Sequence, residues 1–208
     1  MTILVRKIAK SKWPAEECLQ NKSDDEIIPT LRADAVTSCL RTSGDTLSLW
    51  AINDINDVEK AILSLITSPK HERLNTIHIA LIHLDKITEQ ELELKETIGD
   101  TVISSYSETH RDLVELDYRK IGFFCKIILS SIRDGNIKKV SDRQQAELIK
   151  RAASSKIVDQ KTLNPKLQYS LWNIAYDING NEMVKNEDGT FSLVKVPATP
   201  LGTSVTNA

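Results

Sequence analysis

The side chains best suited to acid–base or anion-binding chemistry lie at residues 109–112. Thr109-x-x-Asp112 has the spacing of a helix capping box, with His110 and Arg111 between the two residues. A helix N-terminus that carries a histidine and an arginine can bind an anion, and a histidine held by a carboxylate can act as a general base. A capped helix start with solvated charges accounts for the same residues, and we favour it. His110 and Arg111 are therefore candidate binding residues, and no residue is assigned as catalytic.

A second polar group surrounds Arg41 and Asp45, just before the apolar run Leu47–Ile52. In α/β folds, polar loops at strand ends commonly carry binding or catalytic residues. The sequence Ser-Gly-Asp is also ordinary turn chemistry, and a turn is the favoured interpretation. An enzyme of unfamiliar class, with a site near His110 or Arg41, stays open as an alternative.

Motifs of the common cofactor-dependent enzymes are absent from the sequence. It has no phosphate loop, dinucleotide fingerprint, Gly-x-Ser-x-Gly elbow or His-Glu-x-x-His helix, and seven glycines leave no glycine-rich cradle. His78 and His83 are five apart in a run typical of a strand, so they would point to opposite faces rather than to one metal. The three cysteines, an odd number at wide spacing, fit reduced structural thiols. We expect neither a metal nor a cofactor.

Charge is unevenly distributed along the chain. Residues 119–161, called the basic segment below, carry eleven Lys and Arg against four acids, a net charge of +7, although the whole chain has a net charge of −2. Residues 1–118 carry 13 basic and 21 acidic residues. The near-neutral total therefore conceals a basic segment beside an acidic one, which indicates a contact surface.

We expect that surface on one helix and the turn before it. Ser141-x-x-Gln144 predicts a capped helix over 142–153, the second helix of a compact helix–turn–helix with a basic outer face. Such a face suits phosphate contacts, so nucleic acid is one partner that it would accept. An acidic protein, or the acidic half of the same chain, would fit equally. The predicted binding residues are Lys138, Lys139, Arg143, Lys150 and Arg151.

Apolar periodicity predicts alternating strands and helices in the first half. Apolar and β-branched runs predict strands over 2–9, 47–52 and 76–84. Apolar residues three and four apart predict helices over 31–40 and 57–67, and Thr88-x-x-Glu91 predicts the start of another. The alternation favours an α/β fold, a small sheet with covering helices.

The second half is predicted to be helical with a terminal β-hairpin. Apolar steps of three and four predict one helix of about 25 residues over 109–134, closed by Gly135. Asn164-Pro165 predicts the start of a later helix, which ends before Gly180. Glu187-Asp188-Gly189 between two apolar runs predicts the hairpin turn.

These patterns divide the chain into an α/β region (1–106), a helical region with the basic face (107–178), a hairpin (179–196) and a disordered tail (197–208). No apolar run has the length of a membrane-spanning helix and the N-terminus lacks a signal-peptide pattern, so a cytoplasmic location is expected. The leading hypothesis is a non-enzymatic interaction protein, a component of a bacterial-type multi-protein system, that contacts a protein partner through its basic helical face. A nucleic-acid-binding accessory protein is the alternative, and no membrane contact is expected.

Overall fold

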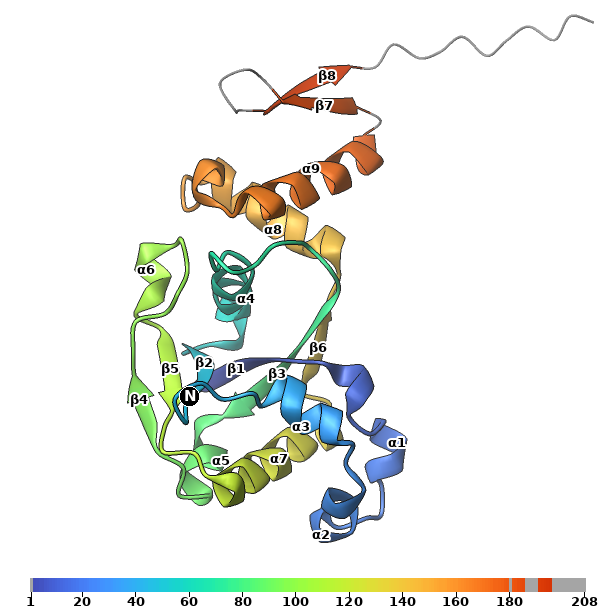
Figure 1. Cartoon of the computed structure of the whole chain (residues 1–208), viewed down its shortest axis with the longest axis vertical. Coiled ribbons are helices and arrows are strands. Elements are labelled where there is room, and N and C mark those ends of the chain that lie inside the picture. Colours follow the sequence, from blue (N-terminus) through green and yellow to red (C-terminus); the bar gives the residue numbers. More distant parts are fainter. Residues whose placement is uncertain (1, 180, 186–190, 196–208) are drawn as a thin grey trace, which may run out of the picture.

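The centre of the fold is a six-stranded antiparallel sheet with the strand order β4-β5-β2-β1-β3-β6. The structure is a computed structural model and describes residues 2–179, 181–185 and 191–195 (Figure 1). The sheet strands are β1 (Ile3–Ile8), β2 (Leu47–Ile52), β3 (Ile77–His83), β4 (Leu94–Glu96), β5 (His110–Leu113) and β6 (Ile137–Val140). The strands expected over 2–9, 47–52 and 76–84 are thereby confirmed as β1, β2 and β3.

Helices cover both faces of this sheet, which confirms the predicted α/β fold. α4 (Val58–Ile66) and α8 (Asp142–Ser154) lie on one face, and α9 (Pro165–Asn179) packs against α8 (Figure 1). α7 (Tyr118–Arg133) covers the opposite face. The short helices are α1 (Glu16–Leu19), α2 (Asp24–Ile27), α3 (Ala33–Cys39), α5 (Leu84–Glu89) and α6 (Ser104–Ser107), with 3-10 turns η1 (Lys10–Lys12), η2 (Ile28–Thr30), η3 (Ile55–Asp57) and η4 (Gln160–Thr162).

The sheet separates two apolar cores because successive strand residues point to opposite faces. On β1, Val5 belongs to the core under α4 and α8, whereas Leu4 belongs to the core under α7. β3 is covered on both faces, with Ile79 in the first core and Ile82 in the second. Burial of these apolar side chains is the main term that stabilises the sheet between its helices.

The helix predicted over 109–134 is wrong in its first part. Residues His110–Leu113 form β5, and α7 begins only at Tyr118. The Asp117 side chain accepts a hydrogen bond from the Lys120 N–H and caps α7, whereas Glu115 has a φ of +54°, in the left-handed region that a helix excludes. Apolar residues on either side of this break matched a helical period by coincidence. The predicted capping box at Thr109 is therefore absent.

A smaller correction concerns the helix after β3. Its predicted start at Thr88 is wrong because α5 begins at Leu84 and contains Thr88, whose hydroxyl donates to the Leu84 carbonyl. The predicted helices over 31–40 and 57–67 correspond to α3 and α4, each one or two residues shorter at its ends.

The C-terminal elements follow the sequence pattern. α8 starts with the Ser141–Gln144 capping box, and α9 starts at Pro165. A β-hairpin of β7 (Asn181–Lys185) and β8 (Phe191–Lys195) follows α9. The turn predicted at 187–189 and the tail predicted over 197–208 lie outside the described residues.

Two of the sheet strands, β5 and β6, come from the region 107–178 that was expected to be helical. The helix–turn–helix expected there is therefore wrong, because β6 stands between α7 and α8. The boundary between regions that was predicted after residue 106 stays a prediction. The sheet contains strands from both sides of it, β1 to β4 before and β5 and β6 after. Among the described helices, none has the length and apolar character needed to cross a membrane.

Candidate functional site

The predicted basic surface is formed by β6 and the outer side of α8. Lys138 and Lys139 are exposed on β6, Arg143 is exposed in the first turn of α8, and Lys150 is half-buried two turns later. β6 is an edge strand because it pairs with β3 on one side only. The structure thus places the four cations on two consecutive elements at one edge of the sheet.

A buried amide fixes α8 against β6. Gln145 is fully buried, and its Nε2 donates to the Asn75 carbonyl at 2.7 Å and to the Val140 carbonyl at 3.1 Å. The capping box adds a donor–acceptor exchange between Ser141 and Gln144, with N···O distances of 2.8 and 3.2 Å. These hydrogen bonds define the position of α8 relative to β6 at this edge of the sheet.

Four other cations of the basic segment pair with acids. Lys126 lies 3.0 Å from Asp25, and Arg133 lies 2.8 Å from Asp24. The segment therefore docks in part on the acidic half of the same chain, one of the alternatives that its charge left open. The other two pairs are Lys120–Glu115 and Arg151–Glu59.

Arg151 is a predicted binding residue whose charge is already neutralised within the chain. Its Nη2 donates to both carboxylate oxygens of Glu59 at 3.0 Å, and these hydrogen bonds raise the pKa of the guanidinium. Within the part of the chain that the structure describes, Lys138, Lys139, Arg143 and Lys150 form no ion pair. We call these four residues the unpaired cations.

Two hollows lie between α4 and α8, and the smaller one also reaches β6. The smaller one, of about 170 Å³, has Ile62, Val140 and Leu148 in its wall, with Lys138 and Lys139 at the β6 side. The larger one, of about 500 Å³, is lined by residues of α4, α6 and α8 and by residues 155 and 157. Residues common to both hollows are Glu59, Glu147, Leu148 and Arg151. The surface thus offers cations, two carboxylates and apolar contacts side by side.

His110 and Arg111 lie away from this surface, on the strand β5. Thr97 Oγ1 donates to Asp112 Oδ2 at 2.9 Å and lies 2.7 Å from His110 Nδ1, so the Nδ1–H of a neutral His110 donates to Thr97. The Ser48 hydroxyl donates to the other oxygen of Asp112 at 3.0 Å. Desolvation lowers the pKa of His110, although Asp112 acts in the opposite sense. The sequence alone does not indicate Thr97 or Ser48, because both join the group only through strand register.

The anion site expected at a helix N-terminus is not formed by His110 and Arg111. Helix α7 begins at Tyr118, and Arg111 instead donates to Glu96 on the neighbouring strand β4 at 2.7 Å. The His110 ring meets the Trp50 ring edge-on, with 5.0 Å between centroids. These contacts describe a hydrogen-bonded strand network in which the arginine is already paired.

The Arg41–Asp45 group is a tight turn. Ser43 and Thr46 exchange backbone hydrogen bonds of 3.2 and 3.3 Å, and Gly44 and Asp45 both have φ near +60°. The Asp45 carbonyl accepts from the Leu116 N–H at 3.0 Å, which ties the turn to the segment before α7. The geometry therefore agrees with the turn interpretation.

Metal ligation has no support among the described residues. They contain no group of three or more His, Cys, Asp or Glu placed to hold a metal ion. Cys18 is exposed, whereas Cys39 and Cys125 are buried, and all three are free thiols. Burial raises the pKa of Cys125 to about 11, which keeps it a neutral thiol.

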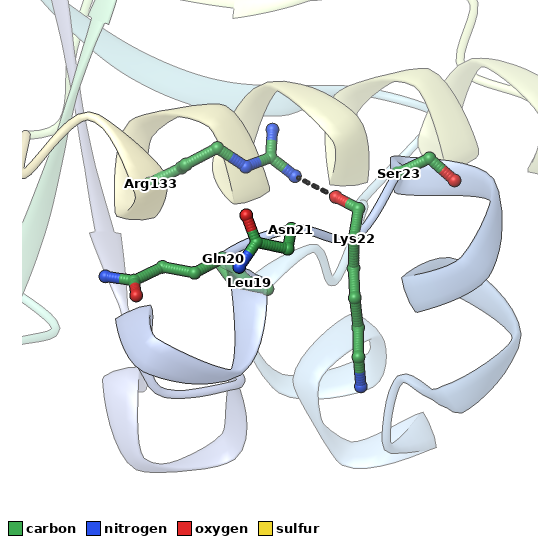
Figure 2. A pocket seen from close by; sticks show the side chains of 6 residues that line it. All are labelled: Leu19, Gln20, Asn21, Lys22, Ser23 and Arg133. Atoms are coloured by element: carbon green, nitrogen blue, oxygen red, sulfur yellow. Dashed lines mark hydrogen bonds between the residues drawn. The ribbon is translucent and has the colours of Figure 1, made fainter.

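A further hollow of about 610 Å³ lies beside the C-terminal end of α7, and sequence analysis did not find it. Figure 2 shows Arg133 reaching toward the Lys22 carbonyl, to which it donates at 3.4 Å. The same Nη2 donates to Asp24 at 2.8 Å. Asp24 therefore neutralises the charge of Arg133 beside this hollow.

His71 gives a testable pH dependence. Burial, with a smaller effect of Lys7, lowers its pKa to about 4, and its Nε2 is buried without a hydrogen-bond partner among the described residues. Between this pKa and the unfolded value near 6.5, only the unfolded chain binds the proton, so this contribution to stability is full above pH 6.5 and falls as the pH falls toward 4. We expect His71→Gln to lose less stability than the wild type between pH 7 and pH 5, by up to about 2 kcal/mol. Urea unfolding at both pH values measures this difference, and equal losses in the two proteins would show that His71 titrates normally.

Comparison with known proteins adds no information about this surface. No family model, no curated protein and no solved structure matches the chain.

Proposed function

We propose that this chain is a non-enzymatic interaction protein of the cytoplasm, one component of a bacterial-type multi-protein system, and that the surface of β6 and α8 binds an acidic protein partner. The observation that supports this proposal is that four cations on β6 and α8 form no ion pair within the described residues. In the same basic segment, Lys126 and Arg133 of α7 and Arg151 of α8 contact acids of the N-terminal half. On β6 and the outer side of α8, the unpaired cations are left for an external partner.

Charge complementarity gives this surface its selectivity. Like-charged partners are repelled and acidic ones are attracted, an effect that acts mainly on association rate and specificity. The apolar walls of the two hollows supply area that a partner can bury, which charges alone do not. The combination is typical of a protein contact, with an apolar centre and a polar rim.

A protein partner fits this surface better than nucleic acid. Both hollows have apolar side chains in their walls: Ile62, Val140 and Leu148 in the smaller one, and Leu63, Leu148 and Ile157 in the larger one. A protein can bury such side chains, whereas nucleic-acid binding depends on closely spaced Lys and Arg. Nucleic acid remains the second candidate because the same four cations would contact it.

The test is charge reversal at the unpaired cations, with Lys138, Lys139, Arg143 and Lys150 all replaced by Glu. We expect the variant to fold normally, because three of the side chains are exposed, Lys150 is half-buried, and surface substitutions each change stability by about 0.5 kcal/mol or less. We expect its partner to be lost in native co-purification, because attraction becomes repulsion. Mass spectrometry of the co-purified proteins, with circular dichroism of the variant, measures both effects.

The matched control reverses four exposed cations elsewhere, Lys22, Arg41, Arg73 and Lys161, which also form no ion pair within the described residues. This control should keep the partner. If the folded first variant retains the same partner as the wild type, the proposal is wrong. Loss of co-purified material after nuclease treatment would instead favour nucleic acid.

A further inference from the structure

We infer that the partner binds as an extended acidic strand that adds to the open edge of β6. This inference rests on the proposed function and names the chemistry of its partner. The structural basis is that β6 ends the sheet opposite β4, as Figure 1 shows, and that β6 carries two of the unpaired cations. An extended peptide that adds to a sheet edge is a recurring mode of recognition.

The register shows which backbone groups of β6 are available. The Leu81 N–H donates to the Asn136 carbonyl at 2.9 Å, and β6 pairs with β3 in the same antiparallel register. Because hydrogen-bonded pairs alternate in such a ladder, Lys138 and Val140 direct their backbone groups toward β3, whereas Ile137 and Lys139 direct theirs away from it. Among the described residues, nothing accepts from the N–H of Ile137 or Lys139.

The charges on this edge select the occupant. Lys138 and Lys139 are adjacent, so their side chains lie on opposite faces of the sheet, and both are exposed. Lysines on an edge strand disfavour pairing with a second copy of that edge, since like charges would meet. The same lysines favour an added strand that carries carboxylates on either face.

The smaller hollow provides a place for one side chain of the added strand. Its wall includes Ile62, Val140 and Leu148, and it adjoins Lys138 and Lys139. In strand addition, main-chain hydrogen bonds supply affinity and such pockets supply specificity for alternate side chains. An acidic strand with a small apolar residue at alternate positions therefore fits the edge and the hollow together.

The probe is a fluorescent eight-residue peptide of alternating Glu and Val, whose binding is measured by anisotropy. Two variants separate hydrogen bonding from charge. Lys139→Gln removes the charge and keeps the N–H, whereas Lys139→Pro removes both, and proline is tolerated on an edge strand where the N–H faces outward. We expect Lys139→Gln to weaken binding a few-fold and Lys139→Pro to weaken it about tenfold more, as the loss of a backbone hydrogen bond implies. A peptide of alternating Lys and Val should not bind.

Amide hydrogen exchange of the wild type provides a test that needs no variant. The peptide should protect the amides of Ile137 and Lys139 and leave those of Lys138 and Val140, which already face β3, nearly unchanged. Absence of binding, equal affinities of the two Lys139 variants, or unchanged exchange at Lys139 would overturn strand addition. Strand addition would also be wrong if the amides of Ile137 and Lys139 were protected only by an oligonucleotide. The same holds if they were protected without peptide, as the protein dimerises. The proposed function fails separately, when the folded charge-reversal variant still binds its partner.

Discussion

Replacing Phe124 by Ala should destabilise the protein by about 3–5 kcal/mol. Phe124 lies on the buried side of α7, is 1 % exposed, and belongs to the core between α7 and the sheet. Truncating a buried aromatic ring removes its transfer free energy and leaves a cavity that neighbours fill only in part. Urea unfolding measures the change, and the expected loss is a large share of the total stability of a small protein.

Tyr118 on the same helix is the control. Its side chain is 90 % exposed, so Tyr118→Ala should change stability by about 0.5 kcal/mol or less. If Phe124→Ala unfolded at the same urea concentration as the wild type, α7 would not be packed on the sheet in solution, and its apolar side would be free for a partner.

The sequence predicted those elements whose apolar period was uninterrupted. β1, β2 and β3 have apolar runs that match a strand, and α8 has a capping box followed by a clear buried side. In these segments local propensity and tertiary packing agree, so the local signal was sufficient. The fold class followed from the same agreement.

β5 could not be predicted in this way. It has four residues, and its neighbours Val114 and Leu116 extended the apolar pattern of α7 backwards. Pairing within the sheet determines that this segment is a strand, because β5 lies between β2 and β4 and pairs with both. Long-range pairing of this kind overrides local preference and leaves little trace in a single sequence.

The candidate surface, too, was predicted only where local sequence determines the structure, and not where long-range contacts do. The five cations predicted to form the basic face lie on β6 and α8, but their charge did not reveal that Arg151 contacts Glu59, 92 positions away in the sequence. Nor did it reveal that Lys138 and Lys139 lie on an edge strand rather than in a turn. Both facts depend on which elements become neighbours. The charge-reversal variant leaves Arg151 unchanged because Glu59 already neutralises it.

Replacing Gly99 by Ala should destabilise the protein by about 1–3 kcal/mol. A Cβ at this position would lie 2.4 Å from Trp50 Cη2 and 2.8 Å from His110 Cβ, far inside van der Waals contact. Trp50 is 4 % exposed and packs edge-on against His110, so neither side chain can move without disturbing the core or the Thr97–His110–Asp112 network. The segment after β4 therefore needs glycine to pass this close to the sheet. Thermal or urea unfolding measures the loss.

Gly122 is the matched control, because it is another glycine replaced by the same residue. It lies inside α7, and a Cβ there would meet nothing within 4 Å. Alanine restricts the unfolded chain and favours the helix, so Gly122→Ala should stabilise the protein by about 0.5–1 kcal/mol. The two substitutions thus have opposite expected signs. If both raised stability, the Trp50–His110 contact would have room that the structure does not show, and the packing of β5 against β2 would need to be revised.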